Sequence, residues 1–297
     1  MIDFRPITPF DKELYLKNIN DGVERGCEFS FANLVIWGNQ NIAEVGGCLV
    51  LFSDFDGRYV YPYPIGKVTR TVVDSIIEDA KTRGICCRIN GITDLGREYL
   101  EREYPENFDY KTNAGAYDYI YNIDDLADLK GKKYQSKRNH INRVKASGIE
   151  YSTKIIDSEN LKHVGVLFDR WCESKLSLDP DFDFEMEREA FKRMSRYYSE
   201  LGAEGMVLVK SGEIVAFTIA TRFFDDTFDV HFEKALSEAD GAYAIINSEF
   251  AKYIRAKYPE VKYLNREEDM GIEGLRRAKE SYRPCKRIVK YRAKYKG

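Results

Sequence analysis

The sequence lacks the features of several classes of protein. It has no run of about 18 apolar residues, and its first six residues contain no hydrophobic signal core. We therefore expect a cytoplasmic chain that is neither exported nor membrane-spanning. Lysine and arginine total 46 against 49 aspartate and glutamate residues, and the net charge of -3 argues against general coating of nucleic acid. A polyanionic partner must then meet a local basic patch.

Cysteine and histidine are too scattered for a metal centre. None of the six cysteines forms a C-x-x-C pair, and the three histidines are far apart, at His140, His163 and His231. We expect no metal ion and interpret the cysteines as reduced and structural. A nucleophilic Cys172 is the alternative, because this residue lies in a predicted helix beside Trp171.

The 297 residues suffice for two domains that each bury a core. The first half reads as two antiparallel strands, a helix, a strand, a helix and a strand, which predicts a mixed α/β (α+β) fold. Its last strand is expected over residues 108–121. We predict a first domain at 1–125, a basic connecting helix at 126–148, and a second domain with the active-site cleft at 149–297.

The connecting helix is strongly basic. Six lysine and arginine residues occur between Lys130 and Arg143 without an acidic residue among them. A solvated helix face explains such a pattern, but acids would be expected in a helix stabilised by its own ion pairs. The alternative is a wall that binds a polyanion, and its candidate residues are Lys133, Lys137, Arg138 and Arg143.

The strand predicted over residues 227–234 alternates between apolar and ionisable side chains. Phe228, Val230 and Phe232 should share one face, and Asp229, His231 and Glu233 the other. Three ionisable groups on one face are ordinary if that face meets water and indicate a functional site if it is buried.

Residues 263–284 combine a strand end, a loop with two glycines and a short helix. In that helix Leu275, Ala278, Lys279 and Tyr282 lie on one face, so Lys279 belongs to an apolar stripe. Its aliphatic stem either lies along the core while the ammonium group reaches solvent, or the ammonium group reaches into a functional cleft. We predict that Asp269 pairs with Lys279, because the loop glycines allow the chain to fold back.

This stretch resembles the C-terminal signature of proteins related to the soluble domain of phosphatidylglycerol lysyltransferase, the DUF2156-like group. The residues that carry the resemblance are Asn265, Asp269, Gly271, Gly274, Leu275, Arg276, Lys279 and Pro284, together with the basic helix at 129–143. The resemblance implies a tandem pair of GNAT-type acyltransferase domains. It also implies that the strand at 227–234 borders the acyl-donor cleft, and it leaves the substrate open.

GNAT proteins that use acyl-CoA hold its pyrophosphate on a glycine-rich turn before a helix. The matching turn here keeps Gly241 but contains Glu238 and Asp240. Two carboxylates would repel a pyrophosphate, so acyl-CoA is disfavoured as a cofactor. The acids could instead bind a cationic aminoacyl group or cap the helix.

Three hypotheses follow for the function. The first is an acyl- or aminoacyltransferase that uses an activated donor, with charged tRNA as one candidate, and a small-molecule or lipid-headgroup acceptor. The second is a CoA-dependent N-acetyltransferase with a degenerate phosphate turn. The third is a non-catalytic ligand-binding protein. The sequence leaves the oligomeric state open and is compatible with a monomer.

In the transferase hypothesis, Glu233 or His231 removes a proton, and Lys279 or Arg276 stabilises the oxyanion. Asp269 completes the predicted catalytic set. The predicted substrate-binding residues are Asn265, Arg276, Asp229 and Gly241.

Overall fold

The computed structural model describes residues 1–19, 24–38, 40–55, 57–148, 150–176 and 184–297. The chain forms two compact units that interleave along the sequence. Unit 1 contains residues 1–118, 268–272 and 287–297, and unit 2 contains residues 119–267 and 273–286. These bounds differ from the predicted division, because the connecting helix belongs to unit 2 and the last residues return to unit 1.

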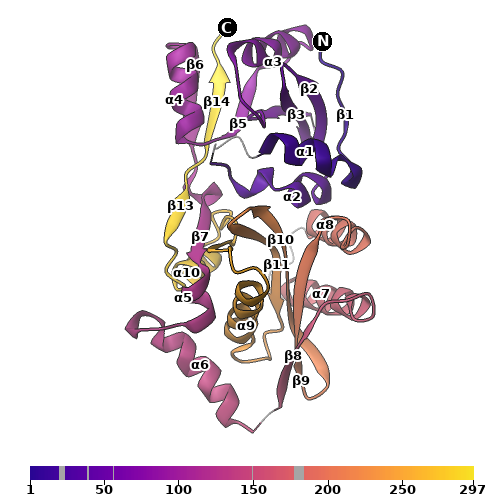
Figure 1. Cartoon of the computed structure of the whole chain (residues 1–297), viewed down its shortest axis with the longest axis vertical. Helices are drawn as coiled ribbons and strands as arrows, with labels where there is room; N and C mark the ends of the chain where they lie inside the picture. Colours follow the sequence, from indigo (N-terminus) through magenta and orange to yellow (C-terminus); the bar gives the residue numbers. More distant parts are fainter. Residues whose placement is uncertain (20–23, 39, 56, 149, 177–183) are drawn as a thin grey trace. The chain divides into compact units, whose positions relative to one another are not determined.

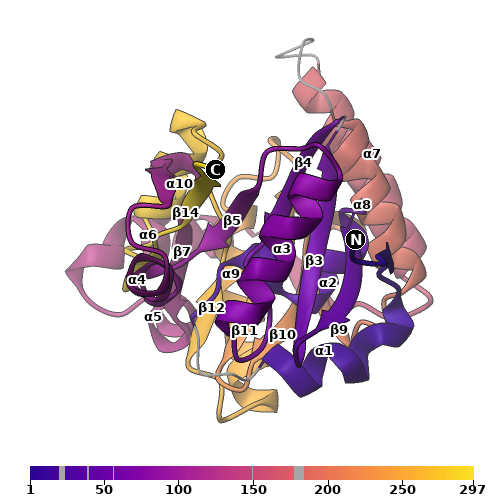
Figure 2. The same cartoon turned by 90° about the horizontal axis from the view of Figure 1, so that it is seen from above.

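Unit 1 is built on a seven-stranded sheet of order β1-β2-β3-β4-β5-β14-β6. The helix α3 (Arg70–Thr82) lies across this sheet (Figure 2), where Tyr61 of β4 donates a hydrogen bond to Asp79. The strands are β1 (Arg5–Pro6), β2 (Gln40–Val45), β3 (Cys48–Phe55), β4 (Arg58–Pro62), β5 (Arg88–Ile92), β6 (Phe108–Thr112) and β14 (Tyr291–Tyr295). The other helices are η1 (Pro9–Asp11), α1 (Lys12–Ile19), η2 (Cys27–Phe29), α2 (Phe31–Ile36), α4 (Asp94–Glu103) and η3 (Ala114–Ala116).

Unit 2 contains the second seven-stranded sheet, of order β13-β7-β12-β11-β10-β9-β8. Figure 1 shows α9 against this sheet and α7 and α8 on its other side. The strands are β7 (Asp118–Asn122), β8 (Tyr151–Ile155), β9 (Ala203–Lys210), β10 (Glu213–Phe224), β11 (Thr227–Ala235), β12 (Tyr263–Asn265) and β13 (Lys286–Ile288). The helices are α5 (Ile123–Asp128), η4 (Lys132–Tyr134), α6 (Gln135–Ala146), α7 (Leu161–Leu176), α8 (Glu185–Arg196), α9 (Ala242–Lys257) and α10 (Glu273–Glu280). None of the helices within the described ranges is both long enough and apolar enough to span a bilayer.

The strand predicted over residues 108–121 is wrong as a single element. It divides into β6 and β7, which belong to different sheets. Between them the side chain of Asn113 accepts a hydrogen bond from Gly115 N at 3.0 Å and starts a single turn of 3-10 helix. A local side-chain cap therefore overrides the β propensity of the tyrosines on either side.

The expected alternation along β11 is also wrong, because a bulge at His231 interrupts it. Val230 pairs with Ala220 and Phe232 with Ile219, so His231 is the extra residue. Phe228 and Val230 belong to the core cluster that includes α9, whereas Phe232 packs against Phe168 of α7. The bulge turns Glu233 toward α9 and leaves Asp229 on the opposite face.

Candidate functional site

The site lies in unit 2, where two parallel strands separate. Strand β11 pairs with β12 only from Thr227 to Asp229, opposite Tyr263–Asn265, and then continues to Ala235 without β12 beside it. The ends of parallel strands are where ligands of open α/β sheets commonly bind, because the diverging backbones leave room for side chains. The bulge directs Glu233 into this region on the side of α9.

Glu233 lies at the centre of a buried polar group. Its Oε1 accepts a hydrogen bond of 2.6 Å from Arg266 Nη2, and its Oε2 accepts one of 3.0 Å from Asn247 Nδ2 of α9. Asn247 is only 2% exposed. Among the described residues, neither Arg266 Nη1 nor Asn247 Oδ1 has a hydrogen-bond partner, although both atoms are buried. A buried donor and a buried acceptor without partners cost free energy, so a bound ligand group would stabilise the arrangement.

Lys137, in the first turn of α6, joins this group. Its Nζ lies 4.0 Å from the ring centroid of Tyr282, and the Arg266 guanidinium lies 4.8 Å from the same ring. Burial, followed by the charge of Arg266, lowers the pKa of Lys137, and Glu233 opposes this shift. We call Lys137, Glu233, Asn247 and Arg266 the opening cluster.

Tyrosines complete the surroundings of the opening cluster. The Arg266 guanidinium lies 5.4 Å from the ring centroid of Tyr121, and burial raises the pKa of both Tyr121 and Tyr282. Tyr243, at the start of α9, is 42% exposed, and desolvation, with a smaller contribution from the charge of Glu233, raises its pKa. The cluster is therefore close to solvent on the side of Tyr243 while its charged groups are largely buried.

The opposite face of β11 carries a second polar group. His231 Nε2 is 2.8 Å from Thr221 Oγ1, and its Nδ1 is 3.3 Å from Glu267 Oε1 and 3.7 Å from Asp229 Oδ2. Both His231 and Asp229 have fully buried side chains. The structure thus brings together His231 and Asp229 as predicted but separates them from Glu233, and a catalytic role for His231 stays a prediction.

The signature loop positions these residues through its backbone. Asn265 Oδ1 accepts a hydrogen bond of 2.8 Å from Glu267 N, and Glu267 has a positive φ of 55°. This turn sends Arg266 and Glu267 to different polar groups. Lys279 donates from Nζ to the backbone carbonyl of Arg266, so it supports the loop that presents the guanidinium.

Three other predicted residues of the signature stretch have the following positions. Asp269 is fully buried and accepts a hydrogen bond from Gly271 N at 2.8 Å. Asp269 belongs to unit 1 and Lys279 to unit 2, and their pairing stays a prediction. Arg276 lies in α10, and its predicted role in substrate binding or oxyanion stabilisation also stays a prediction.

Most of the predicted polyanion wall has partners within the protein. Lys133 forms an ion pair of 2.9 Å with Asp125, and Arg138 donates to the carbonyls of Leu129 and Gly131. Arg143 Nε lies 3.5 Å from Asp240. These contacts favour the structural interpretation for three of the four residues, whereas Lys137 turns toward the opening cluster.

The helix α6 packs directly on the turn that matches the pyrophosphate-binding turn of GNAT proteins. Gly241 has a φ of 73°, and a Cβ at this position would lie 2.8 Å from Val144 Cγ2 and 3.3 Å from the carbonyl oxygen of His140. Asp240 also lies near His140, at 3.7 Å. The side of the turn at Gly241 is therefore covered by α6.

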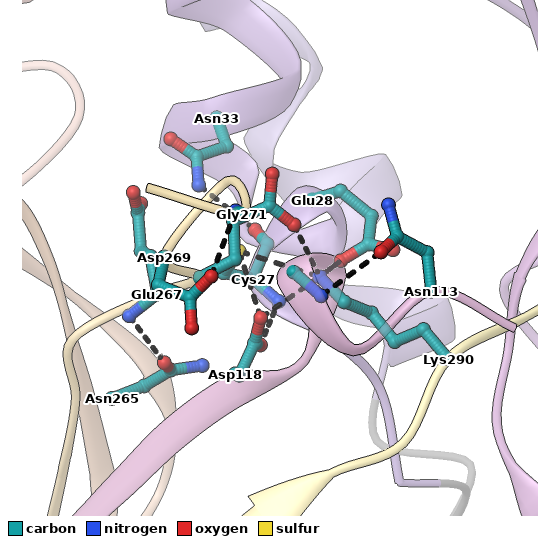
Figure 3. Close-up of polar contacts among 12 residues, drawn as sticks. Cys27, Glu28, Asn33, Asn113, Asp118, Asn265, Glu267, Asp269, Gly271 and Lys290 are labelled. Carbon is teal, nitrogen blue, oxygen red and sulfur yellow. Dashed lines mark hydrogen bonds and ion pairs between the residues drawn. The ribbon is translucent and has the colours of Figure 1, made fainter. Parts of the chain in front are cut away.

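Unit 1 contains a separate charged cluster (Figure 3). Lys290 Nζ lies 2.8 Å from carboxylate oxygens of both Glu28 and Asp118 and 3.2 Å from one of Glu268. Asp118 also accepts a hydrogen bond of 2.6 Å from Cys27 N. Cys27, Glu28 and Asp118 are close enough to ligate a metal ion, but the Lys290 ammonium supplies the positive charge there.

The opening cluster includes residues that the sequence did not single out. Asn247 is a polar residue among the apolar core positions of α9. Arg266 directly follows Asn265, which was predicted to bind substrate. A polar residue among the core positions of α9 is the signal that could have identified Asn247. Nothing in the periodicity indicates which of the many arginines is buried.

The two sheets and their helices define a tandem GNAT-like fold. The structure has a TM-score of 0.52 with a tandem GNAT protein from the clavulanic acid biosynthesis pathway, at 12% identity over 99% of this chain and 98% of that one. It has a TM-score of 0.71 with L-PGS from Bacillus licheniformis, at 18% identity over 100% of this chain and 94% of that one.

The model of the family described as phosphatidylglycerol lysyltransferase, C-terminal, matches residues 21–294, and the chain belongs to this family. A conserved protein of unknown function from Bacteroides thetaiotaomicron VPI-5482 is 36% identical over the whole of both chains, with a TM-score of 0.93. No curated protein matches the sequence. Family and fold together relate the chain to transferases and leave its substrates open.

Proposed function

We propose that the chain is an acyl- or aminoacyltransferase whose reaction takes place at the opening cluster. The observation that carries the proposal is the pair of buried atoms without partners, Arg266 Nη1 and Asn247 Oδ1, on either side of Glu233. A donor and an acceptor held in this way fit a ligand that offers both a carbonyl oxygen and an amino group. An aminoacyl ester has both.

The chemistry assigned to the cluster is acyl transfer. The amine or hydroxyl of an acceptor attacks the ester carbonyl of the donor, a C–N or C–O bond forms, and the ester C–O bond of the donor breaks. The leaving oxygen departs as an alcohol after it receives the proton that Glu233 took from the nucleophile. Arg266 Nη1 donates to the carbonyl oxygen as it gains negative charge. Glu233, whose oxygens have further lone pairs beyond the two bonds described, accepts the proton of the nucleophile.

The packing of α6 on Gly241 favours an aminoacyl donor over acyl-CoA. A pyrophosphate held on this turn needs close access to the backbone, and Val144 and His140 are already there. Arg143 carries a positive charge on the exposed surface beside Asp240. An exposed ion pair of this kind contributes little to stability. A charged tRNA remains the candidate donor, and a small molecule or lipid headgroup the candidate acceptor.

The substitution Glu233→Gln tests the proposal. It retains the shape of the side chain but removes the proton acceptor, so we expect transfer from a pool of charged tRNAs to fall by about 100-fold or more. Glu249→Gln is the matched control, since Glu249 lies in the same helix α9 at a partly exposed position beside Lys252. Equal activity of Glu233→Gln and the control would contradict the assignment, as would ligand binding without any turnover by the unaltered protein.

A further inference from the structure

The opening cluster has an excess of positive charge. Arg266 and Lys137 are cationic and Glu233 is anionic, which leaves one uncompensated positive charge when Lys137 is protonated. Both cations lie against the one ring of Tyr282, at 4.0 and 4.8 Å from its centroid. The two like charges repel each other. The repulsion is stronger beside a largely buried ring than in water, because a low dielectric screens the charges weakly.

Glu233 is bound by Arg266 and Asn247, and within the described part of the chain it receives no hydrogen bond from Lys137. Its oxygens accept from Arg266 and Asn247, and its effect on the pKa of Lys137 is smaller than those of burial and Arg266. An anion placed between Lys137 and Arg266 Nη1 would compensate both cations. A second ammonium group there would add to the repulsion.

We propose that the opening cluster binds a carboxylate, and that the transferred group is therefore an acidic aminoacyl group and not a lysyl group. This inference rests on the proposed function and specifies its substrate class. Lys137 and Arg266 recognise the side-chain carboxylate and the reacting carbonyl, and Asn247 Oδ1 accepts from the α-ammonium group. The family description names a lysyl group, so the inference assigns this chain a transferred group of the opposite side-chain charge.

The neighbouring tyrosines are consistent with this charge preference. Tyr121 and Tyr282 both have pKa values raised by burial, so they are neutral and add no negative charge for a lysyl side chain. The Tyr121 hydroxyl also donates away from the cluster, to the carbonyl of Lys279 at 2.8 Å. Glu233 is thus the carboxylate of the cluster, and Arg266 already neutralises it.

Binding of stable donor analogues tests the inference without requiring turnover. The probes are 3′-amino-3′-deoxyadenosine amides of glutamate, alanine and lysine, with Kd measured by calorimetry. We expect the glutamyl amide to bind at least about tenfold more tightly than the alanyl amide, because a charge-assisted hydrogen bond is gained. The lysyl amide should bind most weakly.

Substitutions at Lys137 localise the preference. Lys137→Glu should reverse the order of the glutamyl and lysyl amides, and Lys137→Met should remove the advantage of glutamyl over alanyl. The matched control is Lys145→Glu, which makes the same charge change at an exposed position of α6. The control should keep the order of the unaltered protein.

The outcomes separate this inference from the proposed function. Tighter binding of the lysyl or alanyl amide by the unaltered protein would overturn the inference and leave the proposed transfer intact. The same order of affinities in Lys137→Met as in the unaltered protein would also overturn it. Failure to bind all three amides, together with no transfer from charged tRNA, would overturn both.

Discussion

At the scale of single residues, Lys290 shows how a buried charge is tolerated. Burial alone would lower the pKa of this lysine, but Cys27, Glu28, Asp118 and Glu268 raise it well above its ordinary value. The ammonium therefore stays charged in the folded protein. Lys290 also links three stretches of chain that are distant in the sequence, namely residues 27–28, 118 and 268.

Replacing Lys290 by methionine should destabilise unit 1. The buried Asp118 carboxylate would lose its cationic partner, at a cost of about 3 kcal/mol in the free energy of unfolding at neutral pH. Because the folded pKa is raised, the contribution of Lys290 is fully present below pH 10.5 and is lost as the pH rises through the folded value. Urea unfolding at several pH values measures this, and Lys296→Met, at an exposed ion pair, is the control. Equal stability of the two variants at pH 7 would contradict the account.

At the scale of elements, the approach of α6 to Gly241 explains why the glycine is needed there. A side chain would have to adopt a φ of 73° and also displace Val144. The same contact places Lys137 and the α9 residue Asn247 within one cluster.

Gly241→Ala should destabilise the protein more than Gly212→Ala does. Both glycines have positive φ, but nothing lies within 4 Å of a Cβ at Gly212, so this control carries the backbone cost of about 1 kcal/mol alone. The contact with Val144 should add about 1 kcal/mol or more for overpacking. Thermal unfolding of the two variants measures the two losses of stability. Equal losses would show that α6 moves away from the added methyl group without a loss of stability.

The sequence predicted most elements of both units, because apolar periodicity and turn residues are local signals, and the family resemblance predicted the tandem fold. Its errors came from interactions that periodicity does not record. The bulge at His231 depends on the pairing of Phe232 with Ile219 and of Val230 with Ala220 on the neighbouring strand. It places Glu233 on a different face from His231. Similarly, Lys137 looked like one solvated cation among six, and only the position of Tyr282 shows that it is directed inward.

At the scale of the whole molecule, the chain returns to its first unit at the end. Strand β14 pairs with both β5 and β6, so it lies within the sheet of unit 1 and not at its edge. The sequence did not predict this strand, since residues 286–297 are short, basic and without a clear apolar alternation. Long-range pairing therefore completes a sheet that begins with β1.

Removal of residues 289–297 should disrupt unit 1 selectively. Hydrogen exchange should become fast in β6, which loses the strand beside it, and faster in β5, which loses β14 but keeps β4, while β9, β10 and β11 keep their protection. A chain that lacks only residues 296–297, beyond β14, is the control. Unchanged protection of β5 and β6 after the longer deletion would contradict the sheet order.

The most direct test of the account is a single-turnover assay of the unaltered protein and Arg266→Gln with charged tRNA and with acetyl-CoA. We predict transfer of the aminoacyl group from tRNA by the unaltered protein, no consumption of acetyl-CoA, and a loss of about 100-fold or more in Arg266→Gln, because the oxyanion loses its donor. Circular dichroism and thermal unfolding establish that the variant is folded. Transfer from acetyl-CoA, or transfer from tRNA at the original rate by folded Arg266→Gln, would contradict the claim that the reaction takes place at the opening cluster.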